Sequence, residues 1–148
     1  MMVPSFLRFA RDERGASMVE FALVLPILCI FIFGAIDFGR ALKVYNNLSA
    51  AARDGARYGA SQSSPLDKLA EISARTQAAY QDAMGVALPA NKIAVEFGPP
   101  VPPPADGPEW VKVKINNFEY DPWTPIPGGQ ALTFNIRARF RWEYRYTP

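Results

Sequence analysis

The chain has 148 residues with a formal net charge of +2, 1 cysteine and 0 histidines. This length suits one small domain plus an anchor, and it excludes a large enzyme with a deep active site. The near-neutral charge gives no indication of nucleic acid binding, and the lack of histidine removes the commonest general base and metal ligand. The cysteine, Cys29, has no partner for an internal disulfide. We therefore predict a protein that is not an enzyme and binds no metal, cofactor or nucleic acid.

An apolar run from Ala16 to Ile36 carries one charge, Glu20, and follows a short stretch that contains arginine. About 20 mainly apolar residues cross the hydrocarbon core of a bilayer as a helix. A secretory signal has a shorter apolar core and a small-residue cleavage site, whereas here Asp37 to Arg40 follow. The sequence therefore predicts a retained transmembrane helix in contact with lipid. Lysine and arginine flank both ends of the run, so their distribution does not decide its orientation.

The helical pattern continues beyond the apolar run, because no proline occurs between Asp37 and Ala60. We predict one helix from Ala16 to about Gly59, roughly 65 Å long at about 1.5 Å per residue. Pro26 lies inside it and removes one backbone donor, which predicts a kink, either purely structural or used when the helix leaves the membrane. One apolar stripe along the second half is expected to comprise Phe38, Ala41, Tyr45, Leu48, Ala52, Gly55 and Tyr58.

Small residues recur every four positions in the second half of this helix. The two series are Ala51, Gly55 and Gly59, and Ala52, Ala56 and Ala60. Small side chains in register let another backbone approach closely, so these positions are predicted to mediate helix packing. Two partners remain open at this point: the protein's own sheet, and the helices of neighbouring subunits.

A second, shorter amphipathic helix is predicted after a polar break at residues 61–64. Ser64 suits the cap position, Pro65 the first helical position, and Asp67 lies three residues after the cap. Gly85 suits the C-terminal stop. The predicted apolar face consists of Leu66, Leu69, Ile72, Thr76, Tyr80 and Met84.

Alternation with period two replaces the helical pattern in the C-terminal part of the chain. Strands are predicted at residues 93–97 and 111–115, separated by the proline-rich segment 98–108. After a turn region at residues 121–129, alternation runs unbroken over residues 132–147. Such a strand belongs in an antiparallel sheet with one covered and one wet face. The predicted fold class is α+β and pilin-like, with a long N-terminal helix, a short second helix and an antiparallel sheet of about three to four strands.

The last strand divides its side chains between two faces. The set predicted to be covered is Leu132, Phe134, Ile136, Ala138, Phe140, Trp142, Tyr144 and Tyr146. The opposite face carries an arginine row of Arg137, Arg139, Arg141 and Arg145. This row is either a solvated sheet face or a surface for an acidic partner, such as a sister subunit.

The start of the apolar run forms a motif with its own chemistry. Residues Gly15 to Phe21 spell GASMVEF, which matches the pattern that type IV prepilin peptidases recognise. Glycine leaves its carbonyl open to attack at the membrane edge, and a carboxylate near the end of a membrane span indicates a partner. In pilins the implied partner of Glu20 is the freed N-terminal ammonium of Ala16 on an adjacent subunit. The alternative is that Glu20 reaches water at the interface, beside an unrelated glycine.

Three segments, RGASMVEFALVLP (14–26), FGAIDFGRA (33–41) and AARDGARYGA (51–60), resemble the TadE-like family. Members of that family are minor pilins, or pseudopilins, of the tight adherence (Tad, or Flp) pilus system. The resemblance implies a leader at residues 1–15 that a prepilin peptidase removes after Gly15. It also implies a transmembrane and extended pilin-like helix at 16–60 and a periplasmic α+β domain at 61–148. The N-terminus would then be cytoplasmic, in a single-pass protein of the bacterial inner membrane.

The resemblance also implies a role in pilus assembly, as part of a priming or tip complex, with possible incorporation into the extracellular fibre. The implied partners are other minor pilins, the major pilin, the prepilin peptidase, the inner-membrane assembly platform and lipid. Phe21 stands where major Flp pilins usually have tyrosine, which together with the long C-terminal part favours a minor subunit. A second hypothesis is an uncleaved, membrane-anchored periplasmic binding or scaffold module of a secretion system.

Overall fold

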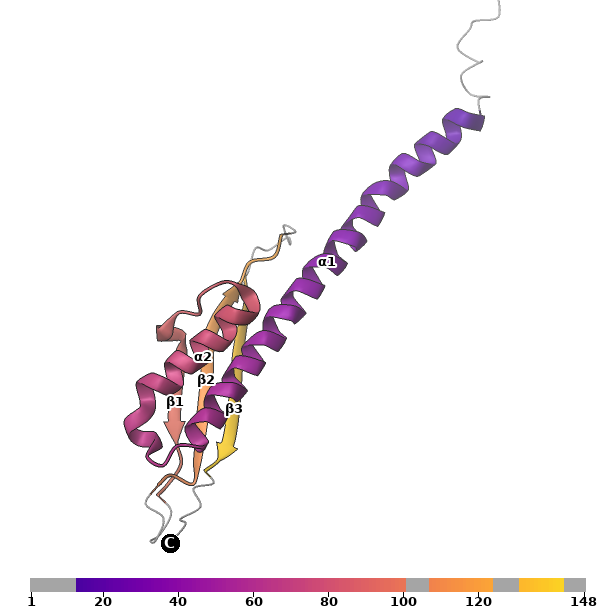
Figure 1. The fold of residues 1–148 in the computed structure, drawn as a ribbon. Coiled ribbons are helices and arrows are strands. Elements are labelled where there is room, and N and C mark those ends of the chain that lie inside the picture. The colour runs from indigo at the N-terminus through magenta and orange to yellow at the C-terminus, as the bar shows by residue number, and fades with distance from the viewer. Residues whose placement is uncertain (1–12, 101–106, 124–130, 143–148) are drawn as a thin grey trace, which may run out of the picture.

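A computed structural model describes residues 13–100, 107–123 and 131–142, with side chains from residue 15 onward. The elements in chain order are helix α1 (Glu13–Ala60), the 3-10 turn η2 (Pro65–Lys68), helix α2 (Leu69–Met84), the 3-10 turn η3 (Ala90–Lys92), and strands β1 (Ile93–Phe97), β2 (Trp110–Tyr120) and β3 (Leu132–Arg141) (Figure 1). This α+β arrangement confirms the predicted fold class. Residues 1–12, which make up most of the predicted leader, and the predicted strand residues Tyr144, Arg145 and Tyr146 lie outside the described residues.

Helix α1 is 48 residues long and continues through Pro26 as a single helical element. At about 1.5 Å per residue it spans about 70 Å. Its first half projects away from the rest of the molecule, and its second half lies along α2 and the sheet (Figure 1). The helix predicted from Ala16 to about Gly59 is confirmed, whereas the kink at Pro26 stays a prediction.

The three strands are antiparallel in the order β1-β2-β3. Val113, at the centre of the sheet, pairs with Val95 on one side and Ala138 on the other. A bulge at Asn116 and Asn117, where Asn117 has a φ of 50°, interrupts the register between β2 and β3. The extra residue shifts the alternation by one position, so the aromatic residues after the bulge stay on the covered face of the sheet.

One face of the sheet is covered by α2 and by residues 37–60 of α1, and together these elements form the α/β body. The buried centre comprises Leu48, Ala52 and Ala56 of α1, Ile72 and Tyr80 of α2, Leu88, Val111, Val113, Ile115, Ile136 and Ala138. Within the described residues, the set predicted to be covered on the last strand is confirmed for Ile136, Ala138 and Trp142, which are buried, and for Phe134 and Phe140, which pack against the core. Leu132, at the end of the strand, is exposed.

The small residues of α1 pack inside the chain. Ala51, Ala52, Gly55, Ala56 and Gly59 are all buried in the α/β body. A Cβ added at Gly55 would overlap the hydroxyl of Thr76 on α2, and one at Gly59 would lie 2.8 Å from Ile72 Cδ1. Of the two partners left open by the sequence, the structure shows the protein's own body.

The predicted apolar faces are partly wrong at their edges. Phe38 is 70% exposed and Tyr45 is 45% exposed, whereas Val44 and Ala51 are buried in their place. Helix α2 and the sheet pack against the side of α1 that carries the small residues. The buried face of α1 is therefore centred on these residues and not on Phe38 and Tyr45. The apolar face of α2 is confirmed for Ile72, Thr76 and Tyr80, but Leu66 and Leu69 are exposed.

The start of the second helical segment also differs from the prediction. Pro65 opens the short turn η2, and α2 begins only at Leu69. Ser64 donates its hydroxyl to Asp67 Oδ2 at 2.6 Å and caps no backbone N–H. The stop at Gly85 is confirmed, since this glycine has a φ of 70° and donates its N–H to Gln81 O.

The contact between α1 and α2 predicts the effect of adding one methyl group. Gly55→Ala is expected to lower the free energy of unfolding by about 1–3 kcal/mol, because Thr76 and the helix behind it must move. Gly39→Ala is the matched control on the same helix, since a Cβ there has nothing within 4 Å. Thermal unfolding of the full chain in detergent micelles, followed by circular dichroism, compares the two. Equal loss of stability in both variants would contradict the packing described here.

Candidate membrane anchor and assembly surfaces

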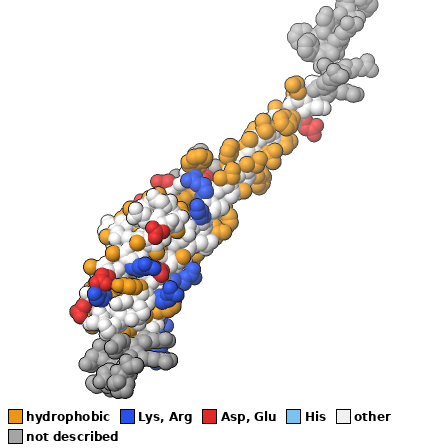
Figure 2. Space-filling view, viewed as in Figure 1, with side chains coloured by type: hydrophobic (Ala, Val, Ile, Leu, Met, Phe, Trp, Pro, Cys, Tyr) orange, Lys and Arg blue, Asp and Glu red, His pale blue; other side chains and the backbone are white. Residues whose placement is uncertain are grey.

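The first half of α1 is a bare apolar rod. Helix residues Gly15–Ala60 contain a window with a mean hydropathy of 2.6, and 0% of that window is buried (Figure 2). The core helix of a soluble protein would instead be covered by the rest of its chain. The apolar residues from Ala16 to Ile36 extend about 30 Å along the axis, which is the thickness of a bilayer core.

The predicted processing and assembly residues lie together at the outer end of this rod. The Gly15–Ala16 bond is in the first turn of α1, which begins at Glu13. Ala16, Glu20 and Phe21 are exposed. Glu20 makes no ion pair with any residue in the described part of the chain. The structure thus presents these residues on the surface, and Glu20 has no ion-pair partner among the described side chains.

Asp37 marks the place where the apolar rod meets the α/β body. It directly follows the apolar run and, from residue 15 onward, is the first buried residue of α1, at 6% exposure. Its Oδ1 accepts the backbone N–H of Trp123 at 3.0 Å, and its backbone carbonyl accepts the Tyr120 hydroxyl at 3.3 Å. The end of β2 is therefore fastened to α1 one residue beyond the apolar run, and we call this contact the Asp37 clasp.

A cation and an exposed aromatic ring complete the Asp37 clasp. Arg40 Nη1 lies 3.7 Å from Asp37 Oδ1, and the Arg40 guanidinium lies 5.0 Å from the centre of the Trp123 ring. Trp123 is 79% exposed although it is a large apolar side chain. Tryptophan and arginine side by side are typical of residues that sit at the level of lipid headgroups.

The uncovered face of the sheet is basic. The arginines of the predicted row that lie within the described residues, Arg137, Arg139 and Arg141, are exposed on this face. Register places Lys114 opposite Arg137 and Lys112 opposite Arg139, so two lysines of β2 join the row. The fourth predicted member of the row, Arg145, lies outside the described residues.

One carboxylate balances the two lysines of this face. Glu96 of β1 accepts hydrogen bonds from Lys114 and from Lys112, the latter at 3.1 Å. The hydrogen bond from Lys114, and to a smaller extent the one from Lys112, lowers the pKa of Glu96. The stability that the Glu96–lysine pairs contribute is therefore fully present above the usual pKa of a glutamate. It is lost as the pH falls through the lowered pKa of Glu96. No described arginine of the row makes an ion pair with a described residue.

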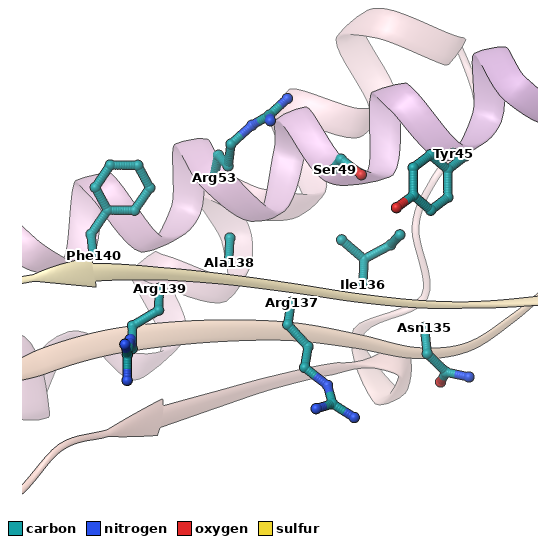
Figure 3. A pocket seen from close by; sticks show the side chains of 9 residues that line it. All are labelled: Tyr45, Ser49, Arg53, Asn135, Ile136, Arg137, Ala138, Arg139 and Phe140. Carbon is teal, nitrogen blue, oxygen red and sulfur yellow. The ribbon is translucent and has the colours of Figure 1, made fainter.

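A groove of about 400 Å³ runs between α1 and β3. Tyr45, Ser49 and Arg53 line it from α1, and residues 135–140 line it from β3 (Figure 3). In Figure 3 the side chains of Ile136, Ala138 and Phe140 point toward α1, whereas Arg137 and Arg139 point to the opposite side of the strand. Among the described residues, no cluster of acidic or cysteine side chains is suited to hold a metal ion.

Sequence reasoning missed the Asp37 clasp, the contribution of Lys112 and Lys114 to the basic face, and the groove. Within the strand predicted at residues 111–115, Lys112 and Lys114 alternate with the apolar residues. The correct pairing of this strand with β3 would have placed both lysines beside the arginines. No local signal pointed to the clasp, because Asp37 and Trp123 are separated by 86 positions in the chain.

The architecture is thus a bare apolar helix that continues into a small α/β body, which is consistent with a single-pass membrane protein. Residues 15–57 match the family model described as TadE-like protein, which confirms the resemblance seen in the sequence. The match covers α1 almost to its end and does not include α2 or the sheet. No curated protein and no solved structure gives a match. The family match and the apolar helix together fit a membrane protein associated with a Tad pilus.

The Asp37 clasp predicts a specific loss on mutation. Asp37→Ala leaves the Trp123 N–H without its acceptor and is expected to lower the free energy of unfolding by about 1–3 kcal/mol. Chymotrypsin should then cleave faster after Trp123, because the end of β2 is released from α1. Asp82→Ala, which removes an exposed carboxylate from α2, is the control. Identical cleavage rates in the two variants would show that the clasp does not hold this segment.

Proposed function

We propose that this protein is a minor pilin, or pseudopilin, that takes part in assembling a Tad pilus. In this proposal the chain is inserted in the bacterial inner membrane with its N-terminus in the cytoplasm and its α/β body in the periplasm. A prepilin peptidase removes residues 1–15 after Gly15, and the mature protein then assembles through α1. The observation that carries the proposal is the family match over residues 15–57, which begins at the processing glycine and contains the bare apolar helix.

The position of Asp37 supports the proposed placement in the membrane. The apolar run ends one residue before the clasp, so a bilayer that covers residues 16–36 ends at the edge of the α/β body. Trp123 and Arg40 would then lie at the level of the periplasmic headgroups, where their apolar and charged parts each find a suitable environment. The body would stand directly on the membrane surface rather than on a flexible linker.

The spacing between Ala16 and Glu20 supports the proposed mode of assembly. A carboxylate inside a bilayer is costly unless it is paired. The two residues are four positions apart, which is about 6 Å along a helix axis. A neighbouring helix shifted by about one helical turn therefore places its Ala16 ammonium beside Glu20, and the pair would fix the register of two otherwise featureless apolar surfaces. Phe21 beside it would add apolar contact.

The proposed role is structural and not enzymatic, in line with a sequence that has 0 histidines and a single cysteine inside the apolar run. The proposed partners are other minor pilins and the major pilin of the same system, together with the peptidase and the inner-membrane assembly platform. The protein would act in the complex that primes or tips the fibre, where one α1 per subunit packs with the helices of its neighbours.

Processing after Gly15 gives a direct test. Mass analysis of the protein purified from cells with an active prepilin peptidase should show a chain that starts at Ala16. The chain should keep residues 1–15 in cells without the peptidase, and also when Gly15→Leu blocks access to the scissile carbonyl. A chain with an intact leader in the presence of the peptidase would instead favour the uncleaved scaffold module.

The role of Glu20 is tested separately from cleavage. Glu20→Gln removes the charge while keeping the size of the side chain, so it should leave membrane insertion intact and reduce the number of pili at least several-fold. Glu109→Gln, on the exposed surface of the body, is the matched control and should assemble normally. Electron microscopy counts the fibres, and carbonate extraction of membranes checks insertion. Normal pilus numbers in Glu20→Gln would refute the register role.

A further inference from the structure

Strand β3 has one edge that pairs with none of the described strands. In an antiparallel ladder the backbone N–H and C=O groups of every second residue point to the same neighbour. The Trp142 N–H is donated to Glu109 O at 3.0 Å, on the side of β2. By alternation, Phe140 and Ala138 also face β2. The backbone groups of Arg137, Arg139 and Arg141 therefore point to the other side, where no described strand lies.

Beside this edge is the groove between α1 and β3, so there is space for an added strand. The groove is about 400 Å³ and follows β3 from Asn135 to Phe140. A strand laid along the edge would turn every second side chain into the groove, toward Ser49, Arg53 and Tyr45 (Figure 3). Short apolar or hydroxyl side chains suit this lining. The intervening side chains would lie on the basic face, next to Arg137 and Arg139.

Charge decides which strand fits. On the basic face three arginines and two lysines surround Glu96, which is already bonded to both lysines. The other described carboxylate on this face, Glu119, lies beyond the bulge and is 3.9 Å from Lys92 Nζ. A second copy that paired through its own β3 would set two arginine rows side by side, which is unfavourable. A strand with acidic side chains at alternate positions would instead meet Arg137, Arg139 and Arg141 across the new ladder.

We infer that the β3 edge binds an extended acidic segment of another protein by strand addition. Main-chain hydrogen bonds to the three arginine residues give affinity, and the arginine side chains select for glutamate or aspartate at every second position. The inference concerns the α/β body and does not depend on cleavage after Gly15. It goes beyond pilus assembly through α1, because it gives the protein a second, separate contact surface.

The test uses the full, uncleaved chain in detergent micelles and a fluorescent peptide of about seven residues, a usual strand length. The probe peptide alternates glutamate with valine, and the control peptide alternates lysine with valine. Fluorescence anisotropy at low salt should show binding of the acidic peptide and much weaker binding of the basic one. Equal binding of both peptides, or binding of neither, would overturn the inference.

Two matched pairs of variants separate strand addition from simple charge attraction. Arg137→Ala removes one exposed charge and should weaken binding about two- to fivefold. Arg137→Pro also removes the N–H that faces the free edge, and should weaken binding by about a further tenfold while leaving the pairing with β2 intact. Ser49→Trp fills the groove from α1 and should abolish binding, whereas Ala50→Trp, exposed on the same helix outside the groove, should not.

Circular dichroism checks that each variant is folded. If Arg137→Pro does not fold, the comparison of Ser49→Trp with Ala50→Trp tests whether the peptide lies along β3. Binding that is unchanged by filling the groove would show that the peptide does not lie along β3. A wild-type chain that dimerises, and whose dimer the acidic peptide does not dissociate, would show that the occupant is a second copy. Either result rejects an acidic partner strand.

Discussion

Everything in this molecule depends on one helix that has to serve two surroundings. From Phe21 to Ile36 the side chains of α1 are apolar and almost all exposed, and from Asp37 onward one side of the same helix is buried in protein. In lipid the side chains of α1 need only be apolar. In the α/β body they must also be small, so that α2 and the sheet can approach the helix closely. Gly55 and Gly59 meet the second demand, since added methyl groups there would collide with Thr76, Ile72 and Val111. The change from large to small residues along α1 is therefore the physical basis of the whole architecture.

The Asp37 clasp follows from this constraint. At the point where the surroundings change, the helix needs a residue that belongs in neither lipid nor an apolar core. The Asp37 carboxylate is 8% exposed as a side chain, yet it finds the Trp123 N–H and the Arg40 guanidinium as partners. A buried charge without such partners would be costly. The clasp thereby marks the C-terminal end of the apolar rod and fixes the position of the α/β body relative to it.

Much of this fold could be predicted from the sequence, because its long elements have a clear period. The bounds of α1, the stop at Gly85 and the alternation of β3 are local properties. The buried side of α1 was predicted less well. Phe38 and Tyr45 were placed in it from hydrophobicity and helical spacing, whereas Val44 and Ala51 are buried instead. Strand order, the clasp and the groove beside β3 depend on residues far apart in the chain, and no local pattern encodes them. The motif at Gly15 to Phe21 could be recognised in the sequence because it is linear, and its role stays a proposal. The clasp and the groove were missed because folding assembles them.

The two surroundings of α1 can be distinguished by a single pair of cysteine substitutions. The natural cysteine is first replaced by alanine, and Phe31→Cys and Phe38→Cys are then made one at a time. The two phenylalanines are almost equally exposed in the isolated protein, at 72% and 70%, so only the membrane should make them differ. A maleimide that does not cross membranes, added to the periplasmic side of spheroplasts, is expected to label position 38 and leave position 31 unlabelled. Equal labelling of both positions would contradict a helix that leaves the membrane at Asp37.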